Sequence, residues 1–173
     1  MKWLEMSKYE VPNNREDYIN DTKAFLMMNC DCELYQFEEI PNAIDKLKEY
    51  VHWQEQDRKA TLSTEISLIP FGHNGGGDLY CFLYSNKTDE PLIVLYYHDE
   101  YGNPEIAGHN FDEFIYIQLL KAVENEEDIG DEYFQNQIMY LNDTYRQLVT
   151  GKDTDTLLDD LYLLKVEEAN IWC

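Results

Sequence analysis

The 173-residue chain has few basic residues: 13 Lys and Arg stand against 35 Asp and Glu, giving a formal net charge of -22 at pH 7. Nucleic-acid phosphates and anionic lipid headgroups are bound by clustered Lys and Arg side chains. The composition therefore argues against nucleic acid and membrane surfaces as partners. A strongly negative surface instead attracts a basic protein and speeds its association, although an acidic composition also serves solubility alone.

Long apolar runs and clustered cysteines are also missing. No stretch of about 18 apolar residues is present, so no transmembrane helix is expected. The N-terminal segment MKWLEMSKYE lacks the apolar region of a secretory signal peptide. Only Cys30 and Cys32 are close in sequence, and their spacing is not that of common zinc sites. We expect a reduced, cytoplasmic protein without a cofactor.

The chain does contain a periodic pattern of apolar residues, and 14% of its residues are aromatic, which argues against disorder. Residues 15–29, and the segment that Pro41 opens, show helical spacing, and a short strand is predicted over 33–37. No linker divides the chain. We therefore predict a single domain over residues 1–173, in which residues 131–173 are a candidate C-terminal helical elaboration.

The middle of the chain predicts an antiparallel meander. The runs 65–71, 78–84 and 92–97 are rich in Ile, Leu, Val, Tyr and Phe, and the turn sequences GHNGGGD and SNKTDEP separate them. One more short strand is expected before Gly108. Because the glycine cluster lies between two strands, with Asp78 where a phosphate site would need a cation, it favours a turn with positive φ angles over a phosphate loop.

Helices are predicted again after this meander. Asn110 and Glu113 have the spacing of a capping box at a helix start. Apolar residues over 134–148 recur at steps of four and three, which predicts one long amphipathic helix, and those over 157–164 predict a final helix. The predicted fold class is α+β, an antiparallel β-meander sheet packed with helices from the N- and C-terminal parts of the chain.

Candidates for a metal or catalytic site are His73, His98 and His109, together with Asp99 and Glu100, because all lie at predicted strand ends or turns. The sequence leaves open whether the three histidines converge in space. No two of these residues have the i, i+4 spacing of a helical metal motif. No Ser lies in a G-x-S-x-G elbow and no Cys lies near a His in sequence. We expect no metal site and no enzymatic activity.

An acidic turn flanked by tyrosines is the candidate contact surface for a protein partner. Tyr and Trp are enriched at interfaces because they bury a large area and keep a polar tip. On a strand, one of Tyr96 and Tyr97 faces the core and the other faces outward. Ordinary packing of sheet aromatics is the alternative for any one of them. The partner-binding candidates are Tyr97, Asp99, Glu100 and Tyr101.

Three sequence motifs follow one another between Glu65 and Val123. Ile69-Pro70-Phe71 ends a predicted strand, Gly77-Asp78 precedes an aromatic strand, and Phe111-Asp112-Glu113-Phe114 opens a helix. This order resembles the SUKH superfamily, which includes the Smi–Knr type of fungal cell-wall regulators. The resemblance implies structural roles for Pro70, Phe71, Gly77, Asp78, Phe111 and Phe114. Gly77 and Asp78 would shape the turn between strands, and the two phenylalanines would anchor the helix under the sheet.

Bacterial members of the superfamily are frequently immunity proteins that bind and neutralise a cognate toxin domain, often a nuclease. The resemblance thus implies a protein partner, a basic toxin domain, and no shared catalytic residues. A nuclease must be basic where it grips phosphates, which suits an acidic inhibitor. Two alternatives remain: a regulatory or scaffold module, and an enzyme or metal protein using the three histidines. The sequence fixes neither the toxin nor the oligomeric state.

Overall fold

The structure, a computed structural model, describes residues 15–86, 90–100, 102–125 and 128–173. The chain divides into two compact units. Of the described residues, the helical unit contains 15–30 and 115–163, and the sheet unit contains 31–114 and 164–173. None of the helices in the described part of the chain has the length and apolar character that crossing a membrane requires.

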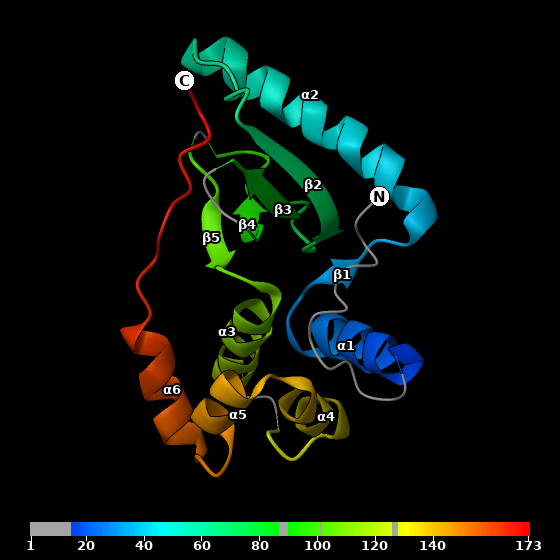
Figure 1. Ribbon diagram of the computed structural model, residues 1–173, viewed down its shortest axis with the longest axis vertical. Helices are drawn as coiled ribbons and strands as arrows, with labels where there is room; N and C mark the ends of the chain where they lie inside the picture. The colour runs from blue at the N-terminus through cyan, green and yellow to red at the C-terminus, as the bar shows by residue number, and fades with distance from the viewer. Residues whose placement is uncertain (1–14, 87–89, 101, 126–127) are drawn as a thin grey trace. The chain divides into compact units, whose positions relative to one another are not determined.

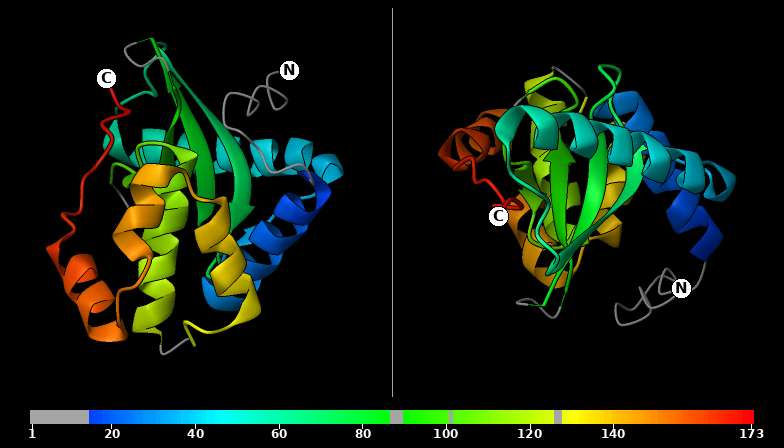
Figure 2. Two further views of the ribbon diagram at one scale, coloured as in Figure 1. Left: turned by 60° about the horizontal axis from the view of Figure 1, so that its bottom comes forward. Right: turned by 90° about the horizontal axis from the view of Figure 1, so that it is seen from above.

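The helical unit is built on α1 (Arg15–Asn29), α4 (Glu132–Tyr140), α5 (Asp143–Val149), α6 (Thr154–Leu163) and most of α3 (Phe111–Glu124). The bounds of α1 are those predicted from the sequence. Helix α1 packs against α4 through the buried rings of Phe25 and Phe134, 6.2 Å apart. The Thr22 hydroxyl donates to Gln137 Oε1 at 3.1 Å in the same interface. Figure 2 shows these helices from two sides.

The prediction of one long helix over 134–148 is wrong, because the chain leaves the helical conformation between α4 and α5. Leu141 and Asn142 are extended, with ψ angles of 148° and 165°. The Asn142 side chain accepts a hydrogen bond from the backbone N–H of Tyr145 at 3.2 Å and so begins a new helix. Asparagine competes for backbone hydrogen bonds in this way. Leu141 is buried, so the apolar spacing continues across the break although the helix does not.

The sheet unit contains the predicted meander (Figure 1). Five strands, β1 (Glu33–Leu34), β2 (Ile66–His73), β3 (Leu79–Ser85), β4 (Leu92–Tyr96) and β5 (Glu105–Gly108), pair antiparallel in chain order. The predicted α+β fold is confirmed. Strand β1 is shorter than the predicted 33–37, because Phe37 already begins a 3-10 turn, η3 (Phe37–Glu39). This turn leads into α2 (Ile40–Arg58), with Pro41 in its first turn as expected.

Helix α2 covers one face of this sheet, as the right-hand view of Figure 2 shows. Leu47 and Tyr50 of the helix pack on the side chains that alternate along the central strands. Buried residues on this face of β3 and β4 are Leu79, Cys81, Leu83, Val94 and Tyr96.

The opposite face of the sheet is an aromatic cluster centred on Phe71. The pairing of β2 with β3 shifts between Pro70 and Gly72, so Phe71 is an extra residue in a bulge, where the missing N–H of Pro70 is tolerated. The Phe71 ring lies 4.6 Å from that of Phe82 and 5.8 Å from that of Phe114 at the start of α3. The Phe111 ring lies 6.4 Å from that of Phe71 and 5.7 Å from that of Phe114. The phenylalanines of the helix start thus lie under the sheet.

The turn between β2 and β3 is the predicted glycine turn. Gly77 has a φ angle of +95°, which favours glycine, and its N–H donates to the Asn74 carbonyl at 3.1 Å. At the start of α3, Asn110 Oδ1 accepts from the Glu113 N–H at 2.9 Å, as predicted. The returning half of the capping box differs, because the Glu113 carboxylate accepts from the N–H of His109 rather than from that of Asn110.

After α6 the chain is extended and joins the sheet unit. The Ala169 N–H donates to the Pro104 carbonyl at 2.9 Å, and the Ile106 N–H donates to the Glu167 carbonyl at 2.8 Å. Ile171 is fully buried. Residues 167–169 therefore lie along β5 and the loop before it, and residues 171–173 pair with residues 61–63.

Replacing Phe71 by Ala should lower the free energy of unfolding by about 3–5 kcal/mol, because the ring is buried among four others. Phe37→Ala is the matched control, since this ring is 66% exposed. It should change the unfolding free energy by about 0.5 kcal/mol or less. Urea unfolding followed by circular dichroism measures both. Equal effects of the two substitutions would contradict the central place of Phe71.

Candidate functional site

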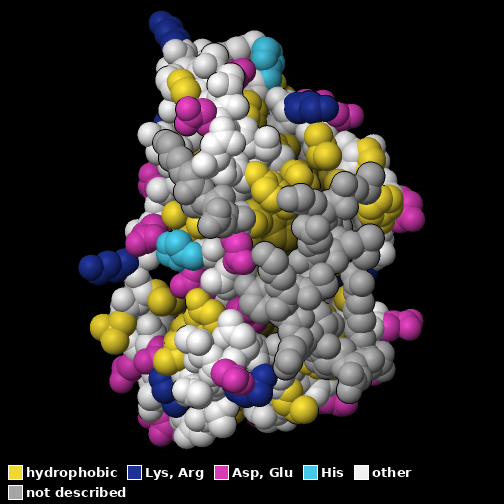
Figure 3. Space-filling model, in the orientation of Figure 1, with side chains coloured by type: hydrophobic (Ala, Val, Ile, Leu, Met, Phe, Trp, Pro, Cys, Tyr) yellow, Lys and Arg dark blue, Asp and Glu magenta, His cyan; other side chains and the backbone are white. Residues whose placement is uncertain are grey.

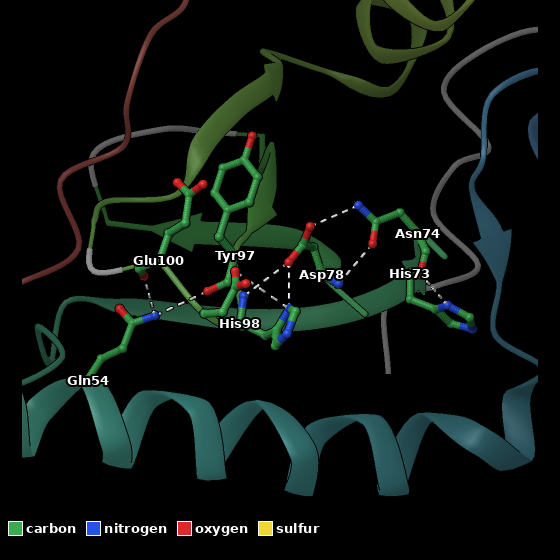
Figure 4. A network of polar contacts seen from close by, with 8 residues as sticks. Gln54, His73, Asn74, Asp78, Tyr97, His98 and Glu100 are labelled. Carbon is green, nitrogen blue, oxygen red and sulfur yellow. Dashed lines mark hydrogen bonds and ion pairs between the residues drawn. The ribbon is translucent and has the colours of Figure 1, made fainter. Parts of the chain in front are cut away.

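The turn that follows β4 is held by one buried side chain of α2 (Figure 4). Gln54 is 3% exposed, and its Nε2 donates to the carbonyl of Tyr97 at 3.1 Å and to that of Glu100 at 3.0 Å. A single amide group thus binds both ends of the turn 97–100. Because helix and strand both belong to the packed sheet unit, the turn has a fixed position on α2.

The acidic side chains of this turn face solvent, whereas Tyr96 is buried and Tyr97 is half-buried. The Asp99 side chain is 71% exposed, and Glu100 is also exposed. Tyr96 is buried in the core, whereas Tyr97 is half-buried and donates its hydroxyl to Glu105 at 2.7 Å. Burial, with this hydrogen bond, raises the pKa of Tyr97, so the phenol stays protonated. Tyr101 lies outside the described residues.

Asp78 ties the glycine turn to the start of the acidic turn. Its carboxylate accepts hydrogen bonds from Asn74 Nδ2 at 2.9 Å, from the His98 N–H at 3.1 Å and from His98 Nδ1 at 2.8 Å. The Asp78 N–H in turn donates to Asn74 Oδ1 at 2.9 Å. Burial alone would raise the pKa of the Asp78 carboxyl, but the hydrogen bonds from Asn74 and His98 together lower it. An ionised Asp78 therefore joins the turn between β2 and β3 to the start of the turn that follows β4 (Figure 4).

An aromatic group on α2 lies beside the acidic turn. The Tyr50 ring is 5.7 Å from the ring of His98 and 6.1 Å from that of Trp53. Tyr50 is buried, but Trp53 is 55% exposed. Trp53 is also the residue before Gln54, which binds the turn directly. We call the four residues Trp53, His98, Asp99 and Glu100 the α2–turn surface.

Of the predicted contact residues, Asp99 and Glu100 belong to the α2–turn surface, whereas Tyr97 is half-buried and hydrogen-bonded to Glu105. Trp53 and Gln54 were missed by sequence reasoning. Their spacing from Tyr50, three and four residues, was a usable signal, since such residues share one face of a helix. The sequence does not show which turn this face of the helix contacts, because Gln54 and Tyr97 are 43 residues apart.

The three candidate histidines do not converge. Leu79 pairs with His73 on one side and with Tyr96 on the other, so His73 and His98 lie at the same end of the sheet. His73 interacts there with the carbonyl of Asn74 and lies 3.8 Å from Glu33, toward β1.

His109 follows β5 at the opposite end of the sheet, because Gly108 pairs with Ile93 near the start of β4. Its ring nitrogens lie 2.7 Å from a Glu113 oxygen and 3.1 Å from a Glu167 oxygen. This histidine links the helix start to the extended C-terminal segment.

The structure brings together a different set with metal-ligand chemistry, Asp78, His98 and Asp99, whose ligand atoms lie within 4.8 Å of one another. The Asp78 oxygens already accept three N–H groups, and a cation would have to displace them. The thiols of Cys32 and Cys81 offer little nucleophilic chemistry, because burial raises their pKa values far above the ordinary value.

These features define the class of protein: an α+β domain whose five-stranded meander carries a bulged Pro-Phe strand, a Gly-Asp turn and a Phe-anchored helix. The family model described as SMI1-KNR4 cell-wall, SUKH_6, matches residues 9–115, more than half of the chain. The chain belongs to this SUKH family, as its motifs predicted. No curated protein and no solved structure matches the chain.

The family match begins at residue 9, whereas the motifs that first indicated the family begin at residue 65. It includes α1 and α2 as well as all five strands, and it ends just after Phe114. Helices α4, α5 and α6 follow the matched region. Trp53, Gln54 and the 97–100 turn, by contrast, all lie within it. Membership associates the chain with toxin-immunity-like and SMI1-KNR4-type proteins.

Replacing Asp78 by Asn tests whether the charge of this carboxylate stabilises the fold. The lowered pKa means that ionised Asp78 stabilises the protein above the unfolded-state pKa of about 3.9, and that this contribution is lost as pH falls through the folded-state pKa. We expect a loss of about 1–3 kcal/mol in unfolding free energy at pH 6, and a clearly smaller loss at pH 3, in urea titrations.

The control for this experiment is Asp99→Asn, which removes the same charge from a side chain that is 71% exposed. It should change stability little at either pH. An equal loss for Asp78→Asn at pH 6 and pH 3 would show that its contribution does not depend on ionisation.

Proposed function

We propose that this protein is an immunity protein that binds and neutralises a cognate toxin domain, basic and of the nuclease type, in a bacterial polymorphic toxin system. It works without catalysis and within the cytoplasm of the cell that it protects. Family membership supports this class of function. The single observation that carries the proposal is the α2–turn surface, where α2 presents the half-exposed ring of Trp53 and, through the next residue, Gln54, holds a turn that carries two exposed carboxylates.

The two kinds of side chain on this surface have complementary effects on binding. A large aromatic that becomes buried in an interface supplies most of the affinity at such a hot spot. Exposed carboxylates add less affinity, but they attract a basic partner and orient it during encounter. Trp53 and the pair Asp99–Glu100 therefore fit a partner with a basic surface around an apolar recess.

The α2–turn surface is also fixed in advance of binding. The Gln54 amide holds the turn to the helix, and Asp78 holds His98 at the start of the turn. Less conformational freedom is then lost when the partner binds. Fast and tight capture is what protection from a toxin requires.

Charge alone does not distinguish this surface from the rest of the molecule. Figure 3 shows Asp and Glu side chains spread over the visible face, with fewer Lys and Arg among them. The net charge of -22 therefore acts at long range on any basic protein. Selectivity has to come from the local combination of aromatic and acidic groups.

Substitutions on the α2–turn surface should weaken binding of the partner captured by this protein from cells of its source. Trp53→Ala should cost about 2 kcal/mol or more of binding free energy. Asp99→Lys with Glu100→Lys should slow association and make it less dependent on salt. Surface plasmon resonance measures both effects.

Two matched controls separate the α2–turn surface from general effects. Tyr162→Ala removes an aromatic side chain that is 69% exposed, on α6, and Glu90→Lys reverses an exposed charge just before β4. Both should leave affinity within about twofold of wild type. If the controls weaken binding as much as the surface variants, the interface lies elsewhere.

The charge and the toxicity of the captured protein test the proposed function. The proposal predicts one dominant basic partner that is toxic when expressed alone and harmless when this protein is expressed with it. Several weakly held, non-toxic partners would instead support a regulatory or scaffold module of the SMI1-KNR4 type.

A further inference from the structure

A cavity of about 300 Å³ opens in the sheet unit beside the 97–100 turn. Its buried side is formed by Gln54 and Tyr96, and exposed residues of its rim include Glu100, Val166 and Glu168. The turn, the loop before β5 and the extended C-terminal segment thus enclose it together. We call it the turn cavity. Its volume is at the lower end of the range found for sites that hold small organic groups.

Two of the residues that line this cavity each have a buried polar atom without a hydrogen-bond partner among the described residues. These atoms are Oε1 of Gln54, in a side chain 3% exposed, and the hydroxyl of Tyr96, in a side chain 1% exposed. The orientation of the Gln54 amide is set by its Nε2, which donates to two carbonyls, so the unpaired atom is the acceptor. Buried polar groups in folded proteins are nearly always paired, so an unpaired one calls for a partner.

The rest of the lining is also rich in acceptors. Glu100, Glu105 and Glu168 contribute carboxylates, and none of the described lining residues is Lys, Arg or His. Burial raises the pKa of Tyr96, so its phenol stays neutral. The neighbouring cation is already engaged, because Arg58 donates to the Gly102 carbonyl at 2.9 Å and lies 5.0 Å from the Trp172 ring.

A group that satisfies this lining must be positively charged and must present several N–H donors in different directions. A guanidinium has five donors in a planar fork, pairs with carboxylates and stacks on aromatic rings. The half-buried ring of Tyr97 and three glutamates in the lining provide both kinds of contact. An ammonium is a more strongly hydrated point charge and matches separated acceptors less well.

We propose that the turn cavity receives an arginine side chain of the protein partner, whose guanidinium binds Gln54 Oε1, the Tyr96 hydroxyl and the surrounding carboxylates. The assignment of the occupant rests on the proposed function. Glu100 belongs both to the cavity rim and to the α2–turn surface, so a partner seated on that surface passes over the cavity mouth. A free amino acid is disfavoured, because the rim carboxylates of Glu100 and Glu168 repel its carboxylate.

The test is an NMR titration of the full chain with N-acetyl-L-arginine N-methylamide, which mimics an arginine within a protein. Saturable shifts in the Gln54 side-chain amide and in the Tyr96 signals are expected. The citrulline counterpart, which is neutral and nearly the same shape, should produce none. Absence of saturable binding by the arginine probe, or equal binding by the citrulline probe, overturns the proposal.

Two variants report whether the probe binds in the turn cavity. Glu168→Gln removes a rim charge and should weaken probe binding about fivefold. Glu90→Gln removes the same charge away from the cavity and should leave binding unchanged. Equal weakening by both would mean that the probe responds to net charge only, which also overturns the site.

The outcomes separate this proposal from the proposed function. If the arginine probe does not bind while Trp53→Ala still weakens partner capture, the cavity proposal fails and the immunity function stands. If the probe binds but free arginine binds equally well, the assignment to a protein side chain is overturned. In the predicted case, the captured partner displaces the probe from the wild-type protein.

Discussion

The side-chain amide of Gln54 is the interaction on which the candidate site depends. It is buried on α2 and donates to two carbonyls of a turn that is 43 and 46 residues away in sequence. This contact fixes the carbonyls of Tyr97 and Glu100 against α2, the helix that carries Trp53. Since a buried amide must be paired, the same contact that places the surface also ties α2 to the end of β4. The Oε1 atom of the same amide has no hydrogen-bond partner among the described residues. In our proposal, a ligand in the turn cavity donates the missing hydrogen bond.

Polar contacts at the end of the sheet complement the apolar packing of its two faces. Leu47 and Tyr50 on one side and the Phe71 cluster on the other bury the strands, but apolar contacts alone do not fix the conformation of a turn. Asp78 does so by accepting hydrogen bonds from Asn74 and His98. The Gly77-Asp78 pair therefore acts at the same end of the sheet as the candidate binding surface.

Features set by local pattern were predictable from the sequence, and those set by distant contacts were not. The helix over 15–29 and the meander follow from apolar periodicity and turn residues, which act over a few positions. The break at Leu141–Asn142 was missed because the apolar spacing continues across a capping asparagine. Asp99 and Glu100 were found as an exposed acidic turn. Trp53 was not, since its importance depends on packing between α2 and β4.

The central claim is that α2 and the 97–100 turn form the surface that a basic protein partner covers. Amide hydrogen exchange of the whole chain, with and without the captured partner, measures this directly. The account predicts slower exchange on binding in residues 49–58 of α2 and in residues 97–100. Protection confined to α4, α5 and α6, with α2 and the turn unchanged, would contradict it.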